Sequence, residues 1–250
     1  IAFLREVRYT VNYRSVIFTQ YRNKGVLHMG HFFSMDNKFF TFMGRVADLC
    51  ILNIICLICC IPIVTAGASI TAMYYVTLKM VRNEEAYIVR SFFKSFKENF
   101  KQATIINLIL IVVGVILYLD MHVAKAMPGS AGQIFHVIFA AFAIVYFVLT
   151  LYVYPVLARF YNSTGNTIKN ALLMSIRHLP YTVVMVLIEL CPLLLLFVRS
   201  FRLQSTLFIL FLIVGFGLIA YCNSFFLAKI FDNYMPENGN AEQESEGREV

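Results

Sequence analysis

A single carboxylate stands in the middle of one of the most apolar stretches of the chain. Glu189 lies within the run from Val183 to Val198, beside Cys191 and Pro192. A charged side chain at the centre of a bilayer is costly, so intramembrane carboxylates usually face a cavity or a partner and bind a proton or a cation. Proline has no backbone N–H, and Pro192 is therefore expected to leave a carbonyl free nearby. Glu189 is the first candidate for an ion-binding residue.

A purely structural role is the alternative for the same carboxylate. Three asparagines occur in other apolar stretches, namely Asn53, Asn107 and Asn223. A protonated glutamate could hydrogen-bond to one of them, or to a nearby Ser or Thr, and so fix how the helices pack. The sequence leaves both roles open and makes all four residues intramembrane candidates.

No pattern in the chain predicts enzyme chemistry. There is no phosphate-binding loop, no metalloprotease helix and no nucleophile elbow. Cys56, Cys59 and Cys60 share one helical face, but no His or carboxylate joins them at the spacing of metal ligands. Buried cysteines of this kind commonly serve as small packing residues. We therefore expect no catalytic residue, no metal site and no cofactor.

The composition is that of an integral membrane protein. Apolar residues make up 60% of the 250 positions, charged residues make up 14%, and the mean hydropathy is +0.73. Soluble domains carry roughly a quarter charged residues. The net charge of +7 comes mostly from Lys and Arg beside apolar runs, where anionic headgroups account for it more simply than nucleic acid does. The expected partner is therefore the lipid bilayer, with no nucleic acid.

Apolar runs long enough to cross the ~30 Å hydrocarbon core predict about five spans. These are residues 46–65, 103–120, 134–156, 181–198 and 205–227. A shorter apolar helix, 68–80, follows the helix breakers Pro62 and Gly67. It could cross back as a sixth span, but we expect it to pack as a partial or interfacial element. The predicted fold class is all-α, a polytopic transmembrane helix bundle.

An amphipathic segment, residues 86–101, precedes the second span. Its aromatic and basic side chains recur at helical spacing on different faces, which is typical of a helix that lies in the cytoplasmic membrane interface. A partner-docking surface is the alternative. The candidates for either role are Arg90, Phe93, Lys94, Phe96, Lys97 and Lys101.

The loop 157–179 is a second candidate for partner docking. It is predicted to hold a short helix, 168–178, and its Gly165, Ile176 and Leu179-Pro180 resemble the coupling loop through which ABC permeases bind their ATPase. The Glu-Ala-Ala start of that loop is missing and the spacing differs. The resemblance therefore indicates a docking function without identifying a permease.

The distribution of basic residues predicts the orientation, because cytoplasmic loops hold an excess of Lys and Arg. Segments 67–101 and 157–179 are richer in them than 123–132 and 199–204. This places the first two segments and the C-terminus in the cytoplasm.

Three regions are expected along the chain. Residues 1–38 form an N-terminal extension, 39–231 the transmembrane domain and 232–250 an acidic tail too polar to bury a core. The Arg- and Tyr-rich start lacks helical periodicity and a signal-peptide core. We expect native translation to start at Met29 or Met35.

Several segments together resemble the YesL family of bacterial membrane proteins. They are residues 61–69, 72–79, 91–104, 154–160 and 169–173. The resemblance spans about 39–227 and implies a small multi-pass protein of a bacterial plasma membrane. Members of the family are often encoded beside carbohydrate ABC-transporter components and two-component sensors. It implies no catalytic or binding residues.

Two functions follow as expectations. The first is an accessory or regulatory component of a carbohydrate uptake or sensing system, with ABC-transporter subunits or a sensor kinase as partners. The second is a small secondary transporter or channel that uses Glu189. Without an evident internal repeat, the chain lacks the duplicated halves of common transporters.

Overall fold

The computed structural model describes residues 38–84 and 87–235 as α-helices and short helical turns, with no strand among them. This confirms the all-α fold class, whereas the predictions for residues 1–37 and 236–250 lie outside the described residues. The chain divides into two units between Arg45 and Val46, and the second unit holds all of the predicted site residues. The elements are α2 (Lys38–Cys60), η1 (Ile63–Thr65), α3 (Ala66–Val81), α4 (Ile88–Ala126), α5 (Ser130–Arg159), α6 (Thr164–Arg177), α7 (Leu179–Leu190), η2 (Cys191–Phe197), α8 (Phe201–Leu210), η3 (Phe211–Gly215) and α9 (Phe216–Asp232).

The number of spans agrees with the prediction. Within the described residues, five helical segments are long and apolar enough to cross a membrane. They are Thr41–Cys60, Ile88–Ala126, Ser130–Arg159, Leu179–Phe197 and Phe201–Asp232. The chain is thus a membrane-type helical protein.

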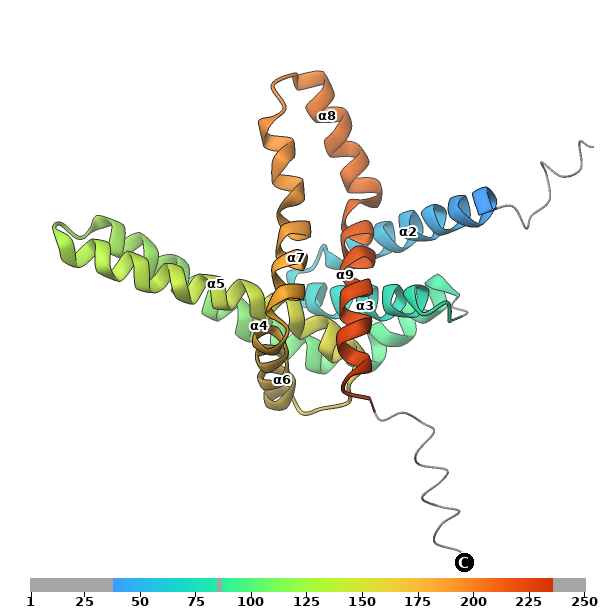
Figure 1. Ribbon diagram of the computed structural model, residues 1–250, viewed down its shortest axis with the longest axis horizontal. Helices are drawn as coiled ribbons and strands as arrows, with labels where there is room; N and C mark the ends of the chain where they lie inside the picture. The colour runs from blue at the N-terminus through green and yellow to red at the C-terminus, as the bar shows by residue number, and fades with distance from the viewer. Residues whose placement is uncertain (1–37, 85–86, 236–250) are drawn as a thin grey trace, which may run out of the picture. The chain divides into compact units, whose positions relative to one another are not determined.

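The short helix α3 lies at the centre of the packing. It contacts α4, α5 and α9 (Figure 1), and ten of its residues are buried. Small side chains allow this close approach. A Cβ atom on Gly67 would lie 2.7 Å from Asn107 Cβ and 2.8 Å from the backbone oxygen of Ala103. Only glycine fits where α3 crosses α4.

Helix α4 joins two elements that the sequence predicts separately. The amphipathic segment 86–101 and the span 103–120 form one continuous helix of 39 residues. At ~1.5 Å per residue it is about 58 Å long, about twice the hydrocarbon thickness. Neither Pro nor Gly occurs between Ile88 and Gly114, so nothing ends the helix at Lys101. The amphipathic residues are therefore the first turns of the same helix that carries the span.

The last two spans form a hairpin with irregular segments in both arms (Figure 1). After α7 the chain tightens into the 3-10 segment η2, and between α8 and α9 it widens into the π-helical segment η3. Tightened or widened turns inside long helices often mark functional positions. The first of them begins two residues after Glu189, the carboxylate singled out from the sequence.

Candidate functional site

Glu189 has a hydrogen-bond partner, and it is one of the three predicted asparagines. The side-chain Nδ2 of Asn223 on α9 donates to Glu189 Oε1 on α7 over 3.1 Å. Tyr74 of the central helix α3 is buried, and its phenol lies within electrostatic range of both the carboxylate and the Asn223 amide. Three helices thus bring a carboxylate, an amide and a phenol together.

One polar atom of this cluster has no hydrogen bond. Asn223 is fully buried, yet its Oδ1 lacks a donor at hydrogen-bonding geometry within the part of the chain that the structure describes. A buried acceptor without a donor is costly, and such groups often mark a site for a proton, an ion or a water. The amide oxygen beside a carboxylate offers oxygen ligands only. The arrangement suits a proton or a hard monovalent cation.

An apolar cavity of about 260 Å³ lies between the two irregular segments. The first residue that lines it, Cys191, follows Glu189 by two positions. Cys191 and Pro192 line it from η2, and Phe211 and Gly215 line it from η3. Ile188 O, four residues before Pro192, accepts the N–H of Cys191, because the helix tightens to 3-10 geometry there. The free carbonyl expected beside Pro192 stays a prediction.

Asn107 is not part of the carboxylate cluster. Its Nδ2 donates to Ile63 O at the break between α2 and α3 over 2.9 Å, and its Oδ1 accepts from the Tyr154 hydroxyl over 2.9 Å. Both ends of the amide are therefore satisfied. Asn107 holds a broken helix end in place.

Asn53 does the same for the π-helical segment η3. Its Nδ2 donates to Leu212 O over 2.7 Å, and its Oδ1 accepts the backbone N–H of Gly217 over 2.8 Å. These backbone groups belong to the widened turn and to the residues just after it. Of the three asparagines, only Asn223 bonds to Glu189.

The predicted docking residues of α4 divide into two groups. Arg90, Phe93, Lys94, Lys97 and Lys101 are exposed, as a surface role requires. Phe96 is not, because it is half-buried against the core, with its ring 6.1 Å from that of the buried Phe92. The exposed face is mainly basic, and its binding role stays a prediction.

The short helix predicted in the loop 157–179 is present as α6, with a different start, and a groove lies beside it. The helix begins at Thr164, earlier than predicted, because Ser163 caps it by accepting the Asn166 N–H. A groove of about 610 Å³ lies beside it. Its lining is Phe160, Asn162, Asn170, Leu173, Met174, Ile176, Arg177 and Tyr234. Leu173 and Ile176 are 54% and 58% exposed, which is high for apolar residues of a connecting helix.

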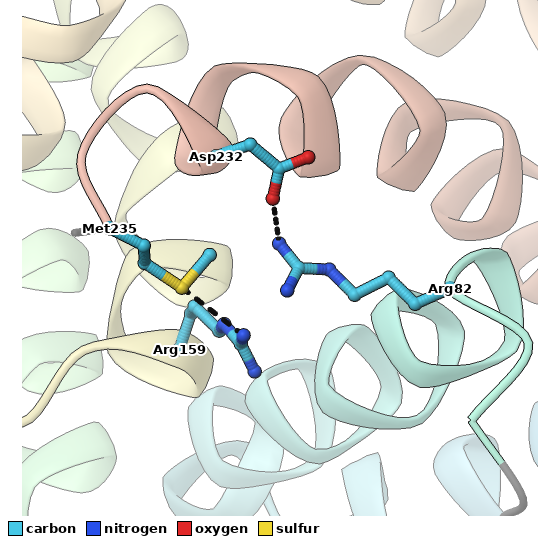
Figure 2. Close-up of polar contacts among 4 residues, drawn as sticks. All are labelled: Arg82, Arg159, Asp232 and Met235. Carbon is cyan, nitrogen blue, oxygen red and sulfur yellow. Dashed lines mark hydrogen bonds and ion pairs between the residues drawn. The ribbon is translucent and has the colours of Figure 1, made fainter. Parts of the chain in front are cut away.

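Sequence reasoning missed a cluster of charges where α3, α5 and α9 end (Figure 2). Arg82 pairs with Asp232 over 2.5 Å, and the guanidinium of Arg159 contacts the Met235 sulfur over 3.2 Å. The two arginines lie far from residues 232–235 along the chain, so no local pattern indicates that they meet. Within the described residues, no three His, Cys, Asp or Glu side chains are grouped to hold a metal ion.

Comparison with known proteins supports the family resemblance. Residues 49–121 match the family model described as "Protein of unknown function, DUF624". Over 125 residues, 50% of this chain, the sequence is 26% identical to "Uncharacterized protein YesL" of Bacillus subtilis (strain 168). That match spans 58% of the relative's length. No solved structure matches. The chain is YesL-like, and neither name assigns an activity.

Proposed function

We propose that this protein is a non-enzymatic accessory or regulatory subunit of a bacterial carbohydrate uptake or sensing system, and that it binds its partner through α6. The observation that carries the proposal is the groove of about 610 Å³ beside this helix. Exposed apolar side chains on a connecting helix between two spans are typical of a docking surface. The carbohydrate context is supported by the resemblance to the YesL family.

The chemistry of α6 indicates what kind of partner segment fits. Lys169, Leu173, Ile176 and Arg177 follow one another at helical spacing, and all four are exposed. Apolar anchors flanked by positive charges match an amphipathic helix that has apolar residues on one face and acidic residues at its edges. A cytoplasmic segment of a transporter or sensor subunit can supply such a helix.

Site-specific photocrosslinking in native membranes tests this proposal. A crosslinking residue at Ile176 should capture a transporter or sensor subunit, and a second one at Val137, equally apolar and 68% exposed, serves as the control. The Leu173→Glu substitution should abolish the crosslink at Ile176 by placing an anion in the groove. The same partner captured with equal yield at both positions would overturn the assignment to α6.

The exposed basic face of α4 is the competing docking surface and can be tested in the same membranes. Charge reversal at Lys94, Lys97 and Lys101 changes only exposed side chains. If α6 carries the interaction, this variant should keep the crosslink at Ile176. Loss of the crosslink in properly inserted protein would shift the docking surface to α4.

A second function, ion-coupled transport, is favoured by the unpartnered Asn223 oxygen in the cluster with Glu189. A carboxylate that exchanges a proton or a cation there could couple to a solute passing between α7 and α9. Proton flux into liposomes that contain the purified protein tests this function. Flux that Glu189→Gln abolishes at unchanged incorporation would support transport, and equal flux in both proteins would remove it.

A further inference from the structure

The guanidinium of Arg159 has no anionic partner among the described residues, although part of it is buried. It belongs to the last residue of α5, and its Nε is buried without a hydrogen bond. Its Nη2 donates to the Met235 sulfur over 3.2 Å (Figure 2). A thioether is a weak acceptor, whereas a guanidinium carries five N–H donors and is always charged. Burying part of a charged group is costly unless that part is paired and hydrogen-bonded.

The neighbouring turn, residues 232–235, already attracts a second arginine. Arg82 donates to Asp232 Oδ1, three residues before the methionine that Arg159 contacts. Figure 2 shows both guanidinium groups directed toward this turn. Because Arg82 engages the carboxylate, Arg159 does not share it in this arrangement.

More positive charge surrounds the same turn. The Arg177 guanidinium lies 5.6 Å from the centre of the Tyr234 ring, and His178 Nε2 lies 3.1 Å from the Tyr234 hydroxyl. Three arginines therefore contact four consecutive residues that include one carboxylate, Asp232. Among these described side chains, three guanidinium groups face one carboxylate, an excess of two positive charges. An anion would balance this excess.

We propose that Arg159, assisted by Arg82 and Arg177, binds a phosphate group at the turn 232–235. Guanidinium groups form paired hydrogen bonds with the oxygens of a phosphate, which a thioether cannot replace. Arg159 and Asp232 are the last residues of two helical segments that are long and apolar enough to cross a membrane, and headgroups lie beyond the ends of such segments. The phosphate can therefore come from an anionic phospholipid headgroup or from a soluble phosphate ion. This site does not depend on a protein partner at α6.

Thermal unfolding of the whole purified protein in neutral detergent tests the site. The probes are phosphatidylglycerol, phosphatidylcholine and inorganic phosphate, each titrated separately. At least one of the two anionic probes should raise the midpoint of unfolding, because a ligand that binds the folded state stabilises it. A response to phosphatidylglycerol alone assigns the site to a lipid headgroup, and an equal response to inorganic phosphate assigns it to a soluble anion. No response to either anion overturns the proposal.

Variants tie the response to the named residues. Arg159→Gln should weaken the apparent affinity about tenfold, the size of one lost charge-assisted hydrogen bond. Lys125→Gln, which changes an exposed lysine in the last turn of α4, should leave it unchanged. Equal loss in both variants would mean unspecific charge attraction and would overturn the site.

One variant keeps the test decisive even if Arg159→Gln does not fold. Asp232→Asn removes the carboxylate that competes for Arg82 and should therefore tighten phosphate binding, although it breaks the ion pair. A residue that only stabilises the fold would not produce tighter binding. Unchanged or weaker binding in Asp232→Asn would contradict the proposed arrangement.

Discussion

The two halves of α5 have similar apolar sequences and opposite surroundings. From Leu151 to Leu157 every residue is buried, including Tyr152 and Pro155. In the first half, apolar residues are widely exposed, with Ile144 at 66% and Val137 at 68%. A helix that is buried on all sides is surrounded by protein, whereas an exposed apolar helix needs lipid or a partner chain. The second half of α5, called the inner half below, is thus held by contacts with the rest of the protein. The first half, called the outer half, exposes its apolar side chains to lipid or to a partner chain.

Polar contacts follow the same division. Tyr152 and Tyr154 lie in the inner half of α5. The Tyr154 hydroxyl donates to Asn107 Oδ1, and the Tyr152 hydroxyl lies 2.7 Å from the Thr182 hydroxyl. Glu189 and Asn223 lie in the other hairpin, which also contains the cavity of about 260 Å³. There the Asn223 Oδ1 is left without a hydrogen bond, whereas the hydroxyls of Tyr152 and Tyr154 are paired. Substitutions in the two regions should accordingly have unequal effects.

The largest effect is expected where α3 crosses α4. Gly67→Val places side-chain atoms where even a Cβ would lie 2.8 Å from a backbone oxygen that cannot move aside. Overpacking of this kind should cost about 3 kcal/mol and lower the unfolding temperature in detergent. Gly165→Ala is the matched control, because nothing lies within 4 Å of the added Cβ. Comparable unfolding temperatures for both variants would show that the crossing is not tightly packed.

The next effect separates the two kinds of asparagine. Asn107→Leu leaves Ile63 O and the Tyr154 hydroxyl without their partners and should lower the free energy of unfolding by about 2 kcal/mol. Asn223→Leu removes one bond to Glu189 together with an already unpaired oxygen, so it should cost less. Chemical unfolding of both variants measures the difference. A larger cost for Asn223→Leu would assign a structural role to the carboxylate cluster.

Hydropathy and helix breakers predict most of the fold, but they do not predict which half of α5 is buried by protein. The five spans, the break at Pro62 and the short apolar helix all follow from local composition. The two halves of α5 cannot be told apart in this way, because the difference arises from contacts with α3 and α6. The separate amphipathic helix is wrong as an element, since its aromatic residues continue without a breaker into the span.

The candidate site is predictable in part. An isolated carboxylate in an apolar run is visible in the sequence, and so are the asparagines that could pair with it. Which asparagine does so depends on how α7 packs against α9. The cluster of Arg82, Arg159 and Asp232 is not predictable, because three helix ends far apart in the chain have to meet.

A smaller effect on stability is expected at Glu189 itself. Glu189→Gln keeps an oxygen that accepts the Asn223 N–H, so the free energy of unfolding should change by less than about 1 kcal/mol. The variant nevertheless replaces a carboxylate, which can take up a proton, with an amide, which cannot. Thermal unfolding and proton uptake by the purified protein should therefore respond differently. A large loss of stability without any change in proton uptake would indicate a packing role.

The smallest effect is expected in the outer half of α5. Val137→Ala removes two methyl groups from a side chain that is 68% exposed, so no cavity forms inside the protein. Its unfolding free energy in detergent should stay within about 0.5 kcal/mol of the parent. Val153→Ala, at a fully buried position of the same helix, should cost about 2 kcal/mol, since it leaves a cavity. If both variants lost the same stability, the outer half would be covered by protein, and a second copy of the chain or a partner would have to provide that cover.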